Sequence, residues 1–310
     1  MEKRSILEKS IGRRRAEGIK NPDDALLKGI SPEELEDILL GTEFNNDLFQ
    51  PPPPRPDCDI CFLPIPDPGQ HEMYQACCGK TLCLGCITAH IMASTKDIFN
   101  CPFCRSPSVK GGEEKAIKEQ IRLLKKRTKA NPNDPLACHQ LGLLLFKESV
   151  EAERDEDVTE ALKLWHRSAQ LGYPYAHYFL GLVYNEGCGV DEDEKKAIHH
   201  WRLAAIGGDL DARQILGSIA YMYTDNMEIA AKHWLLAAEH GHDESLQNVK
   251  LLYTEGHVTK EVFAKALRAH QAVNDEYKSV HRDNAAKYLA KVAKDWEARL
   301  LQTKFFSDTL

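Results

Sequence analysis

The sequence lacks any long hydrophobic run. No stretch of about 18 consecutive apolar residues occurs, so a membrane-spanning helix and a membrane partner are not expected. The segment from Met1 to Lys20 is charged rather than apolar and does not resemble a secretory signal peptide. We therefore expect the protein in a reducing compartment, either cytoplasmic or nuclear.

An excess of positive charge is also absent. The net charge is -7 over 310 residues, which argues against a general nucleic-acid binder. No nucleic-acid partner is expected, since the cysteine-rich region is slightly acidic and has no aromatic and basic surface. The length allows two or three domains, and 43% hydrophobic and 28% charged residues are ordinary for a globular protein.

The first 50 residues are polar and weakly patterned, so residues 1–50 are predicted to be mostly flexible. One short helix is expected from Ser31 as cap, followed by Pro32 in the first turn. Leu35, Ile38 and Leu39 would form its apolar edge. Residues 51–56 form a stiff proline linker, and a connecting helix is predicted over 113–130.

Cysteine is concentrated between these elements. Eight of the ten cysteines lie in residues 57–107, as three CxxC pairs and one adjacent pair: Cys58 and Cys61, Cys77 and Cys78, Cys83 and Cys86, Cys101 and Cys104. Without a secretory signal, such clusters indicate metal ligands rather than disulfides. Eight thiolates complete two tetrahedral zinc sites with Zn–S bonds of ~2.3 Å. The sequence therefore predicts two structural zinc ions, with no open coordination position for catalysis.

The order and spacing of these cysteines resemble the RING finger family over residues 57–107. The resemblance includes Ile60 and the closing run Cys101-Pro102-Phe103-Cys104-Arg105. It implies interleaved ligand pairs. The first zinc would be held by Cys58, Cys61, Cys83 and Cys86, and the second by Cys77, Cys78, Cys101 and Cys104.

This region departs from the common RING pattern at one position. Lys80 stands where the family usually has a histidine ligand, and an ammonium group cannot bind zinc. Cys77 restores the ligand count and gives an all-cysteine variant. Because two neighbouring residues on one ion require a tight geometry, His71 or His90 stays open as a substitute for Cys77 or Cys78.

The RING resemblance also implies partners. Ile60, Phe99 and Pro102 match the positions that contact a ubiquitin-conjugating enzyme. Arg105 matches the basic residue that positions ubiquitin, and its planar fork of donors suits two carbonyl groups. No covalent intermediate is implied, since every cysteine of the finger is assigned to zinc. Transfer would depend on orientation of the reactants.

The second half of the chain repeats itself. Ala-x-x-x-Leu-Gly occurs at residues 137–142, 176–181 and 212–217, and each copy is followed by a tryptophan and a closing glycine. Trp165, Trp201 and Trp234 are 36 and 33 residues apart. A period in the mid-thirties with small residues at fixed places predicts stacked helical hairpins. Small residues allow close helix packing, with the tryptophan between neighbouring hairpins and the glycine as a left-handed cap.

These copies resemble Sel1-like repeats, relatives of the tetratricopeptide repeat, over residues 136–273, with three clear copies and one degenerate copy. A capping helix is expected over 275–303, where an apolar stripe recurs at Leu289, Val292, Trp296 and Leu300. The predicted fold is therefore mainly α: a helical-hairpin repeat solenoid with a small N-terminal zinc-stabilised RING finger.

The first helix of each repeat is expected to line a concave groove. Positions two residues before each repeat leucine are rotated about 200° from it. These positions form a polar row together with Asn185 and Tyr221, which lie further along the same helices. The row comprises His139, Tyr178, Asn185, Gln214, Tyr221 and Gln247. This row is either a partner groove or a set of solvent-tolerant positions.

The sequence as a whole predicts a RING-type ubiquitin ligase or ligase adaptor. The finger would recruit the conjugating enzyme and ubiquitin, and the repeats a protein substrate or scaffold partner. The alternative is a non-catalytic scaffold with a purely structural finger.

Overall fold

The computed structural model describes residues 30–40, 45–66, 72–93, 100–107, 113–152, 155–224, 226–288 and 290–291. The chain divides into two compact units. One unit comprises residues 1–54 and 117–275, and the other comprises residues 55–116 and 276–310. Among the described residues, no helix is both long enough and apolar enough to span a membrane.

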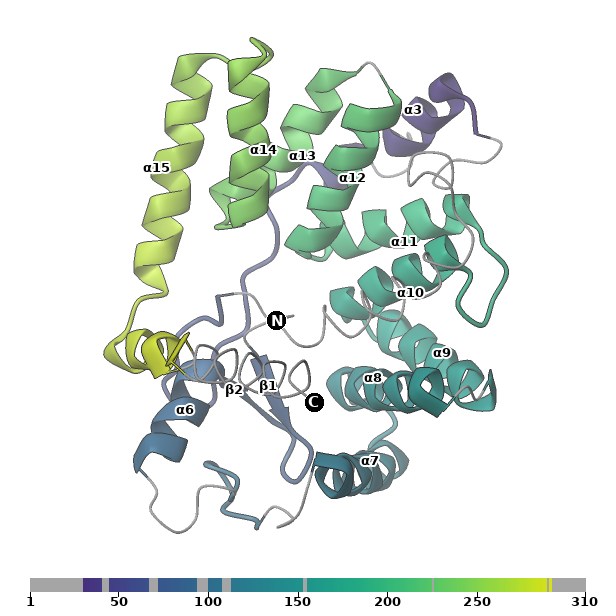
Figure 1. Cartoon of the computed structure of the whole chain (residues 1–310), viewed down its shortest axis with the longest axis vertical. Coiled ribbons are helices and arrows are strands. Elements are labelled where there is room, and N and C mark those ends of the chain that lie inside the picture. Colours follow the sequence, from purple (N-terminus) through teal and green to yellow (C-terminus); the bar gives the residue numbers. More distant parts are fainter. Residues whose placement is uncertain are drawn as a thin grey trace, which may run out of the picture. The chain divides into compact units, whose positions relative to one another are not determined.

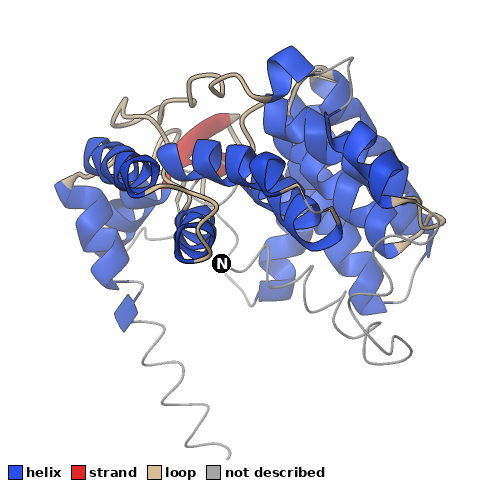
Figure 2. Cartoon of the chain, turned by 90° about the horizontal axis from the view of Figure 1, so that it is seen from above, coloured by secondary structure: helices blue, strands red, loops and turns tan. Residues whose placement is uncertain are grey.

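The first unit is a series of antiparallel helical hairpins (Figures 1 and 2), after the connecting helix α7, Glu113–Ala130. The hairpins are α8 (Pro135–Ala152) with α9 (Asp155–Gln170), α10 (Pro174–Glu186) with α11 (Glu194–Ile206), α12 (Leu210–Tyr223) with α13 (Met227–Glu239), and α14 (Asp243–Thr254) with α15 (Lys260–Glu276). The predicted solenoid is confirmed, and the degenerate copy forms the last hairpin.

Local sequence explains where these helices begin and end. Three helices begin at a residue whose side chain accepts a hydrogen bond from the backbone N–H three residues further along. These residues are Asp193 for α11, Asp209 for α12 and Asn226 for α13. Three hairpins end in glycines with φ between +85° and +98°, in the left-handed region: Gly172, Gly208 and Gly241. The predicted closing caps are confirmed.

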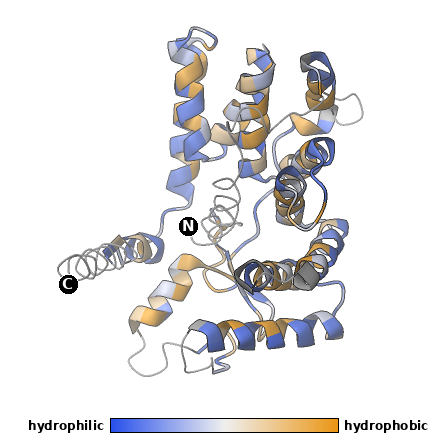
Figure 3. Ribbon diagram, turned by 45° about the vertical axis from the view of Figure 1, so that its right-hand side comes forward, coloured by the Kyte–Doolittle hydropathy of each residue, from blue (hydrophilic) through white to orange (hydrophobic). Residues whose placement is uncertain are grey.

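Each repeat tryptophan packs against the glycine of its own hairpin. A Cβ atom on Gly142 would lie 2.7 Å from Nε1 of Trp165, and one on Gly217 would lie 2.5 Å from Nε1 of Trp234. Trp165 also stacks on Phe179 of the next hairpin, with ring centroids 5.4 Å apart. The indole therefore joins the two helices of one hairpin as well as neighbouring hairpins. Figure 3 shows the hydrophobic and hydrophilic residues along these helices.

The first unit also includes part of the N-terminal segment. Helix α3, Pro32–Leu40, begins as predicted, with the Glu34 N–H donating to Ser31 Oγ at 3.1 Å, and α4 covers Asn45–Leu48. Leu35, Leu39 and Leu48 have no exposed surface, and full burial of each stabilises by about 1.5–3 kcal/mol. Within the segment predicted to be mostly flexible, helices α3 and α4 contact the repeats: α3 contacts α11 and α12, and α4 contacts α11.

The finger dominates the second unit. Strands β1 (Glu72–Gln75) and β2 (Lys80–Cys83) pair antiparallel, with Glu72 opposite Cys83 and Gln75 opposite Lys80. Helix α6, Leu84–Ala93, follows directly. The buried core is small: Cys58, Ile65, Leu82, Cys83 and Cys86. A core of this size, made largely of cysteine, is typical of a fold that depends on metal.

The expected C-terminal capping helix over 275–303 stays a prediction, because only residues up to 288 and residues 290–291 are described in this part of the chain. The described residues from 276 on group with the unit of the cysteine-rich region rather than with the repeats. The side chain of Arg282 lies over Gly85 of α6 and donates to the Leu63 carbonyl at 3.3 Å, because Gly85 has no side chain to fill that space. The predicted stripe from Leu289 to Leu300 lies outside the described residues.

Candidate metal centres

The structure gathers the eight finger cysteines into two groups of four. The first contains Cys58, Cys61, Cys83 and Cys86, and the second contains Cys77, Cys78, Cys101 and Cys104. Within each group all sulfur atoms lie within 4.8 Å of one another. These are the interleaved sets that the sequence resemblance implies. The antiparallel β1–β2 hairpin makes the interleaving possible, since Cys77 and Cys78 lie in its turn and Cys83 at its end.

The sulfur separations fit a tetrahedral metal. The edge of a tetrahedron whose centre lies ~2.3 Å from each corner is about 3.8 Å. In the first group Cys58 and Cys86 are 3.8 Å apart and Cys61 and Cys83 are 3.9 Å apart. In the second, Cys78 and Cys101 are 3.9 Å apart, and Cys77 and Cys104 are 3.5 Å apart. Each group could therefore hold one zinc ion.

Two of the three CxxC loops, those that begin at Cys58 and at Cys101, turn in the same way. The Phe62 N–H donates to the Cys58 carbonyl at 2.9 Å, and the Arg105 N–H donates to the Cys101 carbonyl at 2.9 Å. Phe62 and Arg105 have φ values of 55° and 59°, which are uncommon for residues other than glycine. The two loops thus share one turn that directs both sulfur atoms of a pair to one point.

The thiols within a group oppose one another's ionisation. Burial opposes ionisation of Cys58, but the N–H donors of Cys61, Cys83 and Ile60 outweigh it and lower its pKa to about 7. Burial and the neighbouring sulfur atoms raise the pKa of Cys86 above its usual range. In the second group the Ser106 hydroxyl lowers the pKa of Cys104 to about 6, whereas burial raises that of Cys78 to about 11. A bound cation would favour ionisation of all four thiols in each group.

The structure describes only one of the two histidines that could replace Cys77 or Cys78 as a ligand. His90 lies in α6, and neither group of metal-binding side chains in the described part of the chain includes it. His71 lies outside the described residues. The sulfur atoms of both Cys77 and Cys78 belong to the second group. The geometry therefore supports the adjacent cysteine pair as ligands.

The predicted contact face for a conjugating enzyme is accessible where it is described. Ile60 is 37% exposed, Pro102 is half-buried and Arg105 is exposed. Phe99 lies outside the described residues. Two further apolar side chains were missed: Phe62, which is 75% exposed, and Phe103, which is 45% exposed. Their positions in the sequence could have predicted this exposure, since Phe103 lies within a CxxC loop and Phe62 directly follows one. Such a short loop has no interior that could bury them.

A cation–π contact supports the exposed Phe103. Lys80 Nζ lies 5.3 Å from the centre of the Phe103 ring. The same ammonium is 2.9 Å from Asp59 Oδ1 in the first CxxC loop. Lys80 therefore contacts residues of two CxxC loops, Asp59 in the first and Phe103 in the last.

The polar row of the repeats is only partly accessible. His139 and Tyr178 are 3% and 8% exposed, so they do not line an open groove. His139 packs against Tyr173 and Phe179, with ring centroids 5.0 and 5.3 Å apart. Rotation away from the repeat leucine therefore does not expose His139, because these two rings pack against it, and Tyr178 is buried as well.

The other positions of the polar row are more exposed than His139 and Tyr178. Gln214 and Asn185 are half-buried and Gln247 is exposed. Gln214 Nε2 donates to Glu244 Oε1 of the next repeat at 3.1 Å, and the Tyr221 hydroxyl donates to Glu255 Oε1 at 2.9 Å. These contacts form a polar surface along α12 and α14.

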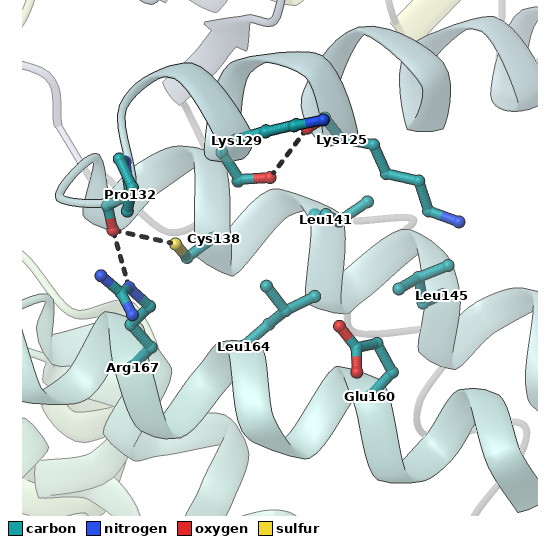
Figure 4. Close-up of a pocket in the computed structure, with 10 residues that line it drawn as sticks. Lys125, Lys129, Pro132, Cys138, Leu141, Leu145, Glu160, Leu164 and Arg167 are labelled. Carbon is teal, nitrogen blue, oxygen red and sulfur yellow. Dashed lines mark hydrogen bonds between the residues drawn. The ribbon is translucent and has the colours of Figure 1, made fainter.

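One pocket of about 350 Å³ lies where α7 meets the first hairpin (Figure 4). Leu141, Leu145 and Leu164 line it together with Lys125 and Glu160. Its mixture of single charges and packing leucines does not define a ligand. Cys138, also in its lining, is buried, and burial raises the pKa of its thiol, as expected for an ordinary structural cysteine.

Comparison with known proteins identifies the repeats. Residues 135–173, 174–209 and 218–242 match the family model named Sel1 repeat. No RING or zinc-finger model matches the chain, and no curated protein matches it.

Two solved structures are similar to the repeat region. A Sel1 repeat protein from Oxalobacter formigenes is 24% identical, with a TM-score of 0.43, covering 57% of this chain and 70% of that one. The protective antigen c5321 of uropathogenic Escherichia coli strains, which displays an SLR fold, is 23% identical, with a TM-score of 0.40, covering 59% and 38%. The chain therefore contains Sel1 repeats, which indicate a scaffold for protein–protein interaction.

Proposed function

We propose that this protein is a RING-type ubiquitin ligase or ligase adaptor. The finger would recruit a charged ubiquitin-conjugating enzyme, and the Sel1 repeats would hold a protein substrate or a scaffold partner. The observation that carries the proposal is the division of eight cysteines into two interleaved sets beside an accessible Ile60 and Arg105. A purely structural finger would not require an exposed apolar residue at the first loop.

Two zinc ions are part of this proposal. Each would be held by one group of four cysteines and would supply folding energy, since structural zinc contributes about 10–16 kcal/mol in small fingers. The two ions would fix the loops that carry Ile60 and Pro102. They would hold these side chains in the geometry that a partner surface needs.

The residues of the finger would act by orientation. Ile60 would pack against a loop of the conjugating enzyme, with Phe62 and Phe103 adding apolar surface. The Arg105 guanidinium would donate to carbonyl groups of the enzyme and ubiquitin and restrain the thioester for attack by a substrate amine. No thiol of the finger would take part, because all eight are ligands.

A non-catalytic scaffold is the second candidate. The observation that favours it is the match of three segments to the Sel1 repeat model, which indicates protein binding without any chemistry. Incubation of purified full-length protein with activating enzyme, ubiquitin, ATP and a panel of conjugating enzymes separates the two functions. Self-modification with ubiquitin supports the ligase, and its absence with every conjugating enzyme supports the scaffold.

A further inference from the structure

Residues 31–40 and 45–54, here called the clasp, pack on the repeats of the same unit. The clasp consists of α3, α4 and the extended run that follows. Three leucines anchor it without any exposed surface: Leu35, Leu39 and Leu48. The clasp lies on α11 and α12, and Figure 1 shows α3 beside α12. It therefore occupies a surface of the second and third repeats, apart from the polar row on α12 and α14.

A buried arginine holds the clasp by its backbone. Arg213 of α12 has no exposed surface, and its guanidinium donates to the Leu48 carbonyl at 2.6 Å and to the Gln50 carbonyl at 3.4 Å. Burial lowers the pKa of Arg213 to about 10, while Asp209 opposes this effect. A buried guanidinium needs acceptors, and here carbonyl groups of a separate segment provide them. Such bonds recognise backbone carbonyl groups rather than a particular side chain.

Side chains of α11 and α13 complete the surface. The Phe49 ring lies 5.0 Å from the His233 ring, between centroids, and Lys232 Nζ is 5.8 Å from its centre. Acidic residues of α3 meet polar and basic partners. Glu34 is 2.5 Å from Lys195 Nζ, and Asn226 donates to Glu36. The surface thus matches an acidic, leucine-bearing helix followed by a short helical turn that ends at Leu48 and Phe49.

The hairpins beneath the clasp have their own packing. Trp201 and Trp234 are buried against Gly181 and Gly217 of their own hairpins, and the clasp contributes nothing to these contacts. The clasp helices have only 9 and 4 residues, too few to be stable alone. Release of the clasp would therefore leave folded repeats with an open surface and an unfolded segment.

We propose that the surface of α11, α12 and α13 around Arg213 and His233 is a peptide-binding site, and that the clasp is its resident ligand. The external ligand would be a protein segment of the same chemistry: an acidic helix with two leucines four residues apart, followed by a short helical turn that ends in a Leu-Phe pair. Such a segment would displace the clasp. The proposal rests on the interaction role of the repeats and is independent of ubiquitin transfer.

A labelled peptide of residues 31–54 tests the site on the full-length chain. A triple variant, called the released chain, should detach the clasp and free the surface. It carries Leu35→Glu, Leu39→Glu and Leu48→Glu. We expect the peptide to bind the released chain at least 100-fold more tightly than the wild-type chain, where the clasp competes. Adding Arg213→Gln to the released chain should weaken binding at least tenfold, whereas Arg268→Gln, at an exposed position of α15, should not. Equal affinity for the wild-type and released chains overturns the proposal.

Hydrogen exchange of the wild-type chain provides an independent measurement. Backbone N–H groups of the clasp, such as that of Leu35 bonded to Ser31 at 2.8 Å, should exchange at least tenfold faster than those of α12. Equal protection, or loss of the repeat helices in the released chain, would make the clasp a fixed part of the fold and overturn the proposal. A wild-type dimer that exchanges clasps between two copies would also overturn it.

Discussion

A Cβ atom on Gly181 would lie 2.4 Å from Nε1 of Trp201, which lies on the second helix of the same hairpin. Equivalent contacts occur between Gly142 and Trp165 and between Gly217 and Trp234. The absence of a side chain at the repeat glycine is therefore a requirement of helix packing rather than of backbone conformation. The indole fills the space that this absence leaves.

Gly181→Ala should destabilise the second repeat. Alanine favours a helix by roughly 0.5–1 kcal/mol, but the clash with Trp201 should outweigh this and give a net loss of about 1–3 kcal/mol. Urea unfolding measures the change. In combination with Trp201→Phe, the added loss from Gly181→Ala should shrink, since the smaller ring leaves room. Equal losses in the two backgrounds would show that the clash is not the cause.

Acid should destabilise the repeats through half-buried histidines. Burial, followed by the neighbouring histidines, lowers the pKa of His200 to about 3 and that of His177 to about 4. The unfolded chain, with a histidine pKa of about 6.5, takes up these protons first. The contribution to stability is therefore complete above pH 6.5 and is lost as pH falls toward 4. At pH 5 the loss should reach roughly 1 kcal/mol per histidine, since partial exposure to solvent weakens the effect of burial.

The pH dependence has a direct check. In thermal unfolding between pH 7 and pH 5, the melting temperature of His200→Gln should fall less than that of the wild-type chain. His257→Gln changes an exposed histidine and should leave the wild-type dependence intact. If the melting temperatures of His200→Gln and the wild-type chain fall by the same amount, His177 and His200 do not determine acid stability.

Metal content should distinguish the ligands from the other cysteines. Elemental analysis of the wild-type chain should give two zinc ions, whereas Cys77→Ser and Cys78→Ser should each lose one. Cys188→Ser, at a buried cysteine outside both groups, should keep two. Full metal content in either Cys77→Ser or Cys78→Ser would contradict the adjacent-ligand assignment and direct attention to His71 or His90.

Chelation should act on the finger alone. Removal of zinc should unfold the region around α6, because its core consists mainly of ligand cysteines. The repeats, whose core contains three tryptophans and many aliphatic residues, should keep their helices. Circular dichroism with a strong chelator should therefore show a small loss of helical signal, and a complete loss would contradict independent stability of the repeats.

Ubiquitin transfer should respond to two substitutions on the finger. Ile60→Ala should weaken capture of the conjugating enzyme, whereas Arg105→Ala should reduce turnover at least tenfold with less effect on capture, because its contact includes ubiquitin. Both variants should retain two zinc ions. Met222→Ala, at an exposed apolar position of the repeats, serves as the control. Full activity in both finger variants would exclude this face as the working surface.

The sequence by itself determined the repeats and the grouping of the cysteines. The glycines, alanines and tryptophans carry this information because they recur at a fixed period, and local packing within one hairpin requires them. The cysteine pairs are similarly local, since a CxxC loop directs two sulfur atoms to one point. The resemblance of their order to a RING finger then implied which pairs combine, and the β1–β2 hairpin brings those pairs together.

Only the tertiary structure decided which surfaces are covered. His139 and Tyr178 are polar or amphipathic in sequence yet buried, and the rings of Tyr173 and Phe179 pack against His139. Arg213 looks like a surface charge in its helix, but carbonyl groups from a segment 165 positions away in the chain accept its hydrogen bonds. Arg282 likewise contacts the finger rather than the repeats. Contacts between segments distant in sequence leave no periodic signal, so burial at these positions followed from the fold alone.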